Sequence, residues 1–198
     1  MLRWGRFAIA YAVMSAGAAL TSLVWQGALP MTIEDPWLSL RPAEAHAYSA
    51  LLGAALGGAV VVLTRVSVAR FVWARRLHQE LRPLARGLSM TGVFTLAALS
   101  ALGEELLFRG LLQPWLGLLP QAFLFGALHQ VRGPGRWAWM VWATAMGLLL
   151  GATFKLTGSL AGPIAAHALV NGLNLRYLKL HDPEPPRRVL GGLLGERS

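Results

Sequence analysis

Six long stretches of this 198-residue sequence contain no Asp, Glu, Lys or Arg. They are residues 7–33, 45–64, 87–103, 110–131, 137–154 and 156–175. A helix needs roughly 20 apolar residues to cross the hydrocarbon core of a bilayer. Only 14% of the residues are charged, whereas a soluble domain carries about a quarter. The runs therefore predict an all-α, polytopic transmembrane bundle of about six helices, some of them short.

Basic residues are concentrated in every second connection between these runs. The connections after the first, third and fifth expected helices, counted with the last residue of each helix, contain only two basic residues, Arg41 and Lys155, and three acidic ones. The opposite set, with both termini, carries 15 basic residues: Arg3, Arg6, Arg65, Arg70, Arg75, Arg76, Arg82, Arg86, Arg132, Arg136, Arg176, Lys179, Arg187, Arg188 and Arg197. The positive-inside rule then predicts cytoplasmic N- and C-termini in a bacterial inner membrane. The net charge of +9 is thus a topology signal, and we expect no nucleic-acid partner.

The runs divide the chain into a single membrane domain, 1–180, and a disordered cytoplasmic tail, 181–198. We expect membrane helices at about 7–29, 46–64, 90–112, 120–132, 137–155 and 159–177, with an exposed outer loop near 30–45 and a turn at Gln113-Pro114-Trp115. Apolar residues alternate with six arginines over 65–88, which predicts an amphipathic helix on the cytoplasmic membrane surface. The first two helices are interpreted as packing elements without chemistry.

Two pairs of glycines have the spacing of close helix–helix contacts. They are Gly53-x-x-x-Gly57 and Gly147-x-x-x-Gly151, each inside an expected membrane helix. Small residues four apart let a neighbouring backbone approach closely. Both pairs therefore predict packing contacts. The absence of cysteine excludes disulfides, a thiol nucleophile and cysteine metal sites.

Charged residues inside a membrane helix are informative, because each costs about 3 kcal/mol at the bilayer centre on insertion scales. Residues 103–110 read Gly-Glu-Glu-Leu-Leu-Phe-Arg-Gly. Glu105 and Arg109 are four residues apart with the acid first, which predicts an ion pair along one helix face. Glu104 then points about 100° away and has no partner in its own helix. An unpaired buried carboxylate of this kind suits a general base or acid.

Two histidines and an asparagine lie in other expected membrane helices. His129 follows Phe125 by four residues, and His167 precedes Asn171 by four, so that each pair shares a helix face. If the outer helix ends lie near residues 112, 120 and 159, a rise of about 1.5 Å per residue places Glu104, His129 and His167 at a similar depth. The spacing predicts one polar site near the middle of the membrane.

These residues form three patterns in a fixed order. Glu104-Glu105-x-x-x-Arg109, Phe125-x-x-x-His129 and His167-x-x-x-Asn171 resemble the signature motifs of the CAAX protease and bacteriocin-processing (CPBP) family, which includes the type II CAAX prenyl endopeptidases. The resemblance covers about residues 90–175. It implies an all-helical intramembrane endopeptidase that acts on a membrane protein or peptide. The substrates it implies are CAAX-type proteins, bacteriocin precursors or C-terminal sorting signals, the last as in myxosortase-like bacterial members.

The resemblance also implies a role for each residue. Glu104 would activate a water for attack on a peptide carbonyl, and His129 would help to position that water. The developing oxyanion would be stabilised by His167 and Asn171. The remaining pair, Glu105 and Arg109, would support the site.

Zinc is a candidate cofactor, because the family is often called metalloprotease. Its candidate ligands are Glu104, His129 and His167, since Glu105 is better explained as the partner of Arg109. Using Glu104 as a ligand would remove the obvious base, so we favour a water activated without an obligatory metal. Two further functions stay open: a non-catalytic member of the same fold that binds a membrane partner, and a small proton-coupled transporter.

The charge asymmetry leads to a prediction of topology. Reporter fusions placed after Arg41 and after Arg132 should report opposite sides of the membrane, because the chain crosses an odd number of times between them. Paired alkaline phosphatase and green fluorescent protein fusions measure this. The same location for both fusions would contradict six crossings.

Overall fold

The computed structural model describes residues 3–183 as a bundle of helices. They are α1 (Arg3–Gln26), α2 (Pro42–Arg70), α3 (Val72–Arg86), α4 (Met90–Glu105), the π-helix η1 (Leu106–Leu112), α5 (Gln113–Leu116), α6 (Leu118–Leu128), α7 (Arg136–Thr157) and α8 (Ala161–Leu180). This part of the chain contains no β-strand beyond one bridge between Thr32 and Ser159. The expected all-α fold is confirmed. Most of the predicted tail, from residue 184 on, lies outside the described residues.

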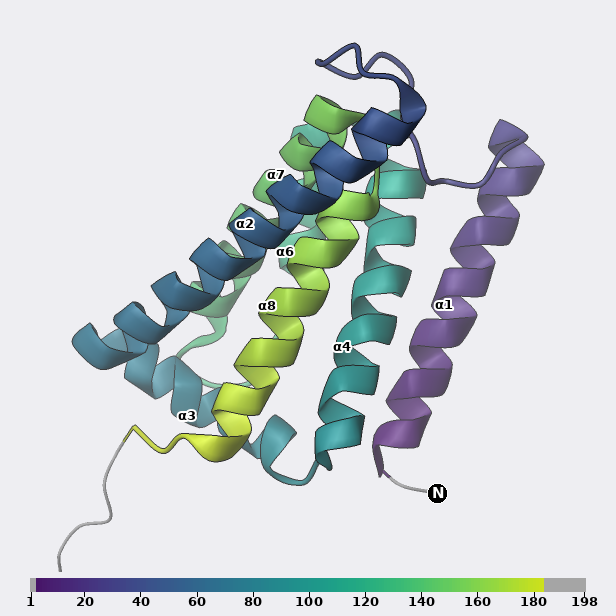
Figure 1. Ribbon diagram of the computed structural model, residues 1–198. Helices are drawn as coiled ribbons and strands as arrows, with labels where there is room; N and C mark the ends of the chain where they lie inside the picture. The colour runs from purple at the N-terminus through teal and green to yellow at the C-terminus, as the bar shows by residue number, and fades with distance from the viewer. Residues whose placement is uncertain (1–2, 184–198) are drawn as a thin grey trace, which may run out of the picture.

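Helix α8 is the centre of the bundle (Figure 1). It packs along α2 on one side and α4 on the other, and its last turns meet α3. Helices α6 and α7 form a hairpin behind it, and α1 packs against α4 at the edge of the bundle. Helix α8 therefore lies between α2 and α4, and α6 joins the bundle through α7 and η1.

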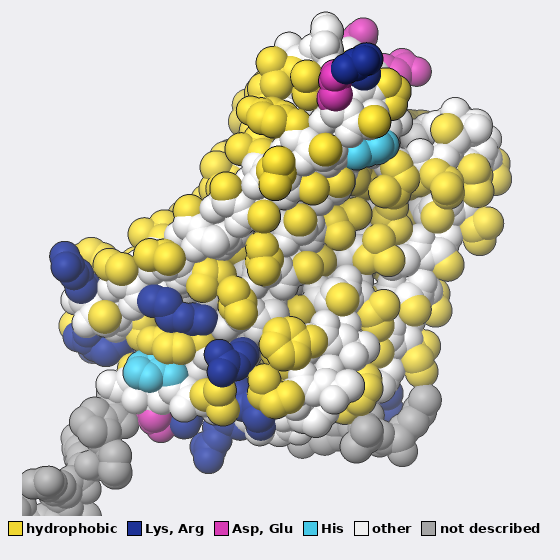
Figure 2. Space-filling view, viewed as in Figure 1, with side chains coloured by type: hydrophobic (Ala, Val, Ile, Leu, Met, Phe, Trp, Pro, Cys, Tyr) yellow, Lys and Arg dark blue, Asp and Glu magenta, His cyan; other side chains and the backbone are white. Residues whose placement is uncertain are grey.

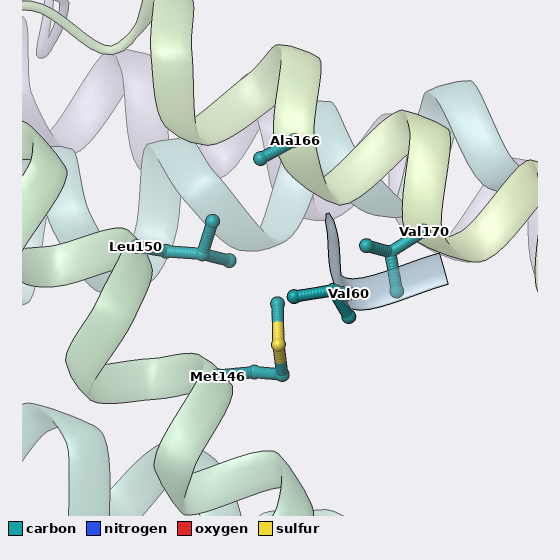
Figure 3. Close-up of a cluster of buried hydrophobic side chains, with 5 residues drawn as sticks. All are labelled: Val60, Met146, Leu150, Ala166 and Val170. Atoms are coloured by element: carbon teal, nitrogen blue, oxygen red, sulfur yellow. The ribbon is translucent and has the colours of Figure 1, made fainter. Parts of the chain in front are cut away.

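A cluster of apolar side chains joins α2, α7 and α8 below the outer loops. Figure 3 shows Met146 and Leu150 of α7 pointing toward Val60 of α2, with Ala166 and Val170 of α8 completing the cluster. All five are buried. Because lipid tails are themselves apolar, close packing rather than water exclusion holds such contacts in a membrane.

Both glycine pairs lie at close helix contacts, as predicted. A Cβ atom on Gly53 would lie 2.0 Å from the Gly162 carbonyl oxygen, so α2 and α8 touch backbone to backbone. On α7, a Cβ on Gly147 would lie 3.0 Å from the Cα of Ala122 in α6. The absence of side chains at these positions is what allows α8 and α6 to approach their neighbours.

Among residues 3–183, four helical segments are long and apolar enough to cross a membrane: Trp4–Gln26, Pro42–Arg70, Met90–Leu116 and Arg136–Thr157. The other two expected crossings, α6 and α8, do not meet this criterion of length and hydropathy. Helix α6 has 11 residues and a length of about 16 Å, half of a crossing. Helix α8 has 20 residues, but it lies inside the bundle, where a helix is shielded from lipid and retains polar residues.

The two ends of the bundle differ in charge. On the face in Figure 2, Lys and Arg gather mainly at the lower end, acidic side chains mainly at the upper end, and hydrophobic side chains cover the middle. The N-terminus, α3 and the end of α8 share the lower end (Figure 1). This agrees with a membrane protein whose predicted inner loops lie together, and the orientation itself stays a prediction.

Most residues of the first connection, 27–41, are exposed, as expected, but the connection also contacts the bundle. Its backbone pairs with the α7–α8 junction: the Trp37 N–H donates to the Lys155 carbonyl at 2.8 Å, and the Leu160 N–H donates to the Met31 carbonyl at 3.0 Å. Pro30 is fully buried and lies against Gly110. The loop 27–41 is therefore docked onto the end of the bundle.

The predicted amphipathic helix begins later than expected. Residues 65–70 continue α2, and the break comes at Phe71, whose backbone is extended. Arg65 does not end the membrane helix because α8 satisfies it: its Nη2 donates to the Leu173 carbonyl at 2.7 Å, and its guanidinium lies 3.6 Å above the Tyr177 ring. The amphipathic helix is α3, with Leu77 and Leu81 on its buried face.

The expected turn at Gln113-Pro114-Trp115 is also wrong. The chain remains helical through the π-helix η1 and α5, so Pro114 lies within a continuous helical stretch and removes one backbone N–H donor from it. His129, in turn, is not inside a membrane helix. It is the first residue after α6, with φ −84° and ψ 72°.

The contact between Gly53 and Gly162 predicts an asymmetric response along α2. We expect Gly53→Ala to lower stability by about 1–3 kcal/mol, because its Cβ would overlap the α8 backbone. Gly58→Ala is the matched control, since nothing lies within 4 Å of a Cβ there. Thermal unfolding of both variants in detergent measures the difference. Equal midpoints would show that the α2–α8 contact is looser than the structure has it.

Candidate active site

The polar residues of the first motif lie where α4 changes into a π-helix. Glu104 and Glu105 are the last two residues of α4, and Arg109 lies in the middle of η1. The wider π turn shifts the following side chains relative to a regular helix, and such turns occur mostly at functional sites. Gly103, just before the two glutamates, lies against α1. The site is thus built at an irregular point of an otherwise regular membrane helix.

Glu105 and Arg109 form the predicted ion pair, fully buried inside the bundle. Arg109 Nη1 lies 3.0 Å from Glu105 Oε1, and both side chains are 0% exposed. The guanidinium also lies 4.4 Å above the Phe125 ring, and its Nη2 donates to the Gly147 carbonyl at 3.4 Å. Helix α7 thus supplies one further acceptor and α6 a ring face, while Arg109 Nε and Glu105 Oε2 have no hydrogen-bond partner among the described residues.

Each histidine is oriented by a hydrogen bond at Nδ1. His167 Nδ1 lies 2.6 Å from Glu105 Oε1, and His129 Nδ1 lies 2.7 Å from the Phe125 carbonyl oxygen. A carbonyl oxygen and an ion-paired carboxylate only accept, so both Nδ1 atoms carry the proton. The Nε2 atom of each ring is then free for the site, with a lone pair when the ring is neutral.

The two Nε2 atoms converge on Glu104. Its Oε2 lies 3.6 Å from Nε2 of His129 and 3.8 Å from Nε2 of His167. These separations are too long for a direct hydrogen bond. The same oxygen is buried and has no hydrogen-bond partner among the described residues. The geometry therefore places one carboxylate oxygen and two ring nitrogens around a common point.

The residues around this point differ in solvent exposure. The exposed fraction of the side chain falls from 25% for His129 to 10% for Glu104, 7% for His167 and 0% for Glu105. The site is therefore reached from the side of His129. The Phe125 ring lies among these polar residues, with its centroid 4.2 Å from the His129 ring, 6.1 Å from the His167 ring and 4.4 Å from the Arg109 guanidinium.

Asn171 is the one predicted site residue that the structure does not bring to Glu104. Its Nδ2 donates to Ser100 Oγ at 3.0 Å, and Ser100 in turn donates to the Ala97 carbonyl. Asn171 lies one turn along α8 from His167, and Ser100 one turn before Glu104. The amide therefore lies next to the site, bound to a serine that the motif spacing did not point to.

Tyr11 is a second residue that sequence reasoning missed, because α1 was interpreted as packing alone. Its hydroxyl group interacts with the Glu104 carboxylate. A Cβ on Gly103 would lie 3.0 Å from the Tyr11 carbonyl oxygen and 2.8 Å from Met14 Cε, so α1 is in tight contact with α4 beside the glutamates. Tyr11 is the only tyrosine in the run 7–33, which is the signal that could have pointed to it.

Zinc accepts the donor atoms of Glu104, His129 and His167, but a glutamate that binds zinc is no longer free to act as the base. Zinc at a catalytic site takes three protein ligands at about 2.0–2.2 Å. Among residues 3–183, no three His, Cys, Asp or Glu side chains form a group that could hold a metal ion. Glu105 is occupied by Arg109 and His167. We therefore assign no chemical step to a metal.

Comparisons with known proteins agree with this picture over part of the chain. Residues 86–173 match the family model described as type II CAAX prenyl endopeptidase Rce1-like. The chain is also similar to the uncharacterized protein YpbD of Bacillus subtilis (strain 168), with 36% identity over 85 residues. That alignment covers 43% of this chain and 44% of YpbD, less than half of either protein. No solved structure matches the chain.

The matched segment contains every residue of the three motifs and the whole contact chain from Arg109 to His129. The family match gives no support to a metalloprotease label. Over residues 86–173, less than half of its length, the chain is therefore similar to the CAAX protease and bacteriocin-processing family of membrane proteins.

Proposed function

We propose that this protein is an intramembrane endopeptidase that hydrolyses a peptide bond of a membrane-associated protein or peptide. The observation that carries the proposal is the carboxylate of Glu104, buried and faced by Nε2 atoms of two histidines from separate segments. Each histidine is held by its other ring nitrogen. A preoriented base with two imidazoles around one point is the arrangement that water activation requires.

In the proposed mechanism, Glu104 is the general base. It accepts a proton from a water whose oxygen attacks the peptide carbonyl carbon, with Nε2 of His129 accepting the water's second hydrogen bond. The tetrahedral intermediate then loses its amine. The proton held by Glu104 passes to the leaving nitrogen as the C–N bond breaks, and the products are a carboxylic acid and an amine. This proton balance needs no additional reactant.

His167 is suited to stabilise the negative charge on the carbonyl oxygen. When the ring carries protons on both nitrogens, Nε2–H donates toward the space beside Glu104 while Nδ1–H stays bound to Glu105. Asn171 is a second candidate donor, but its amide would first have to leave Ser100. Glu105 and Arg109 touch neither substrate nor water in this scheme. They hold His167 and Phe125 in place.

The substrate belongs to the proposal only as a class. The matched family model is described by a prenyl endopeptidase, and the exposed side of His129 is the side from which a peptide would enter. CAAX-type proteins, bacteriocin precursors and C-terminal sorting signals all present an extended peptide at a membrane. We infer that the substrate is such a membrane-anchored peptide segment.

The test is whether cleavage depends on the two groups that face the water. We expect Glu104→Gln and His129→Ala each to lower turnover at least about 100-fold while inserting normally, because general-base catalysis contributes about 10²–10⁴-fold. The probes are a farnesylated, internally quenched CAAX peptide, its unprenylated form, and bacterial membrane proteins in vesicles. New peptide ends are counted by mass spectrometry.

Glu34→Gln is the matched control, since it removes an exposed carboxylate far from the site. Turnover near the wild-type rate in either site variant would remove that residue from the mechanism. The absence of new ends with the wild-type protein on all three probes would favour the non-catalytic membrane partner. Arg109→Ala is unsuitable here, because breaking a buried ion pair costs about 3–5 kcal/mol and unfolding would confuse the result.

A separate measurement concerns zinc. We expect purified active protein to contain far less than stoichiometric metal and to keep its activity after dialysis against a strong chelator, because Glu104 as a zinc ligand would no longer be free to act as the base. Elemental analysis, paired with the peptide assay, decides this. Stoichiometric zinc, with activity lost on its removal and restored by adding it back, would overturn the metal-free mechanism.

A further inference from the structure

The segment that carries His129 is a short loop fixed at its far end by α3. Helix α6 ends at Leu128 and α7 begins at Arg136, so seven residues, 129–135, connect them. Both carboxylate oxygens of Glu80, on α3, accept the backbone N–H of Gly135, at 3.0 and 3.3 Å. Gly135 is the N-cap residue directly before α7. Glu80 thus binds the end of the loop opposite to His129.

Two glycines let the Glu80 carboxylate lie directly on the loop backbone. A Cβ atom would come within 2.9 Å of Glu80 Oε2 at Gly133 and within 2.5 Å at Gly135. Gly133 also has a φ of +125°, which L side chains rarely adopt. A carboxylate at the start of α7 is further stabilised by the unpaired N–H groups and the positive end of the helix dipole. The loop backbone is therefore shaped to receive the Glu80 carboxylate.

The position of the loop is transmitted to the His129 ring by two routes. Along the chain, only five residues separate His129 from Gly135. Through space, Trp139 in the first turn of α7 lies with its ring 6.2 Å from the His129 ring. His129 lies after the end of α6, and its backbone N–H donates to the Gly126 carbonyl rather than to the carbonyl four residues back. Its backbone is therefore not held by the regular hydrogen bonds of a helix. Movement of the start of α7 would thus move His129 relative to Glu104.

We infer that Glu80 is a positioning residue, which sets the distance between His129 and Glu104 by holding the 129–135 loop. The inference rests on the proposed function. Glu80 lies outside the matched family segment, on the amphipathic helix α3. Its carboxylate does not touch the site and acts through the loop backbone. The seating of α3 at the membrane surface is therefore coupled to the geometry of the active site.

The kinetic test compares Glu80→Ala, Glu80→Gln and Gln79→Ala, the last being the half-buried neighbour on α3. We expect Glu80→Ala to lower kcat about tenfold with KM nearly unchanged, because a 1 Å misplacement can cost up to about 100-fold. Glu80→Gln should restore most of the rate, since its amide oxygen still accepts the Gly135 N–H. Gln79→Ala should behave like the wild-type protein. The probe is whichever of the three above is cleaved.

A second variant approaches the same contact from the loop. Gly135→Ala places a methyl group against Glu80 Oε2 at a position whose backbone conformation tolerates alanine. We expect it to lower kcat as Glu80→Ala does, and the double variant to be no worse than either single one, because both remove one interaction. Additive losses would show that Glu80 and the loop act independently and would overturn the inference.

A spectroscopic readout separates positioning from helix capping without any substrate. In protein labelled with ¹⁵N-histidine, the His129 ring signal is assigned with His129→Gln. We expect Glu80→Ala to shift or broaden this signal, and Glu80→Gln and Gln79→Ala to leave it in place. A lower melting temperature with an unchanged kcat and an unchanged His129 signal would show a cap only. A responding signal in a protein that cleaves no probe would contradict the proposed function and leave the positioning role standing.

Discussion

The buried ion pair between Glu105 and Arg109 is the constraint on which the interior depends. Both side chains are fully buried, and either one without the other would leave a charge in the membrane interior, which costs several kcal/mol. The pair is tolerated because α7 approaches closely enough at Gly147 to offer a carbonyl oxygen, and Phe125 offers its ring face. The ion pair thus requires the close approach of α7 at Gly147 and the position of α6 that places Phe125, in addition to what packing requires.

The ion pair also organises the residues nearest to the surface. Glu105 orients His167, the Phe125 backbone orients His129, and both rings then present Nε2 to Glu104. The ion pair between Glu105 and Arg109 is fully buried, whereas His129, at the other end of this series of contacts, is partly exposed. A base at the open end of a rigid polar series is preoriented before any substrate arrives, which is where electrostatic catalysis gains most.

The charged site residues could be predicted from the sequence, because a charged side chain within a membrane segment costs free energy and is therefore rare there. Glu104, Glu105 and Arg109, which lie between two uncharged runs, had to find partners, and a spacing of four residues identified one pair correctly. The glycine contacts followed from spacing as well. The errors share a cause, since they concern where helices end. Arg65 remains in α2 because α8 binds it, Pro114 continues a helix, and His129 lies just beyond α6. Helix ends are decided by tertiary partners that spacing does not show.

The sequence by itself determined that the chain is a helical membrane protein, which segments are apolar, and which few residues carry chemistry. Hydropathy and charge are properties of each residue and persist in any arrangement of the helices. Only the tertiary structure decided that Asn171 binds Ser100, that Tyr11 of α1 faces Glu104, and that Glu80 of α3 holds the loop of His129. These contacts join residues that are distant in the chain, and their formation depends on how closely whole helices pack, a sum over many weak contacts that no local pattern records.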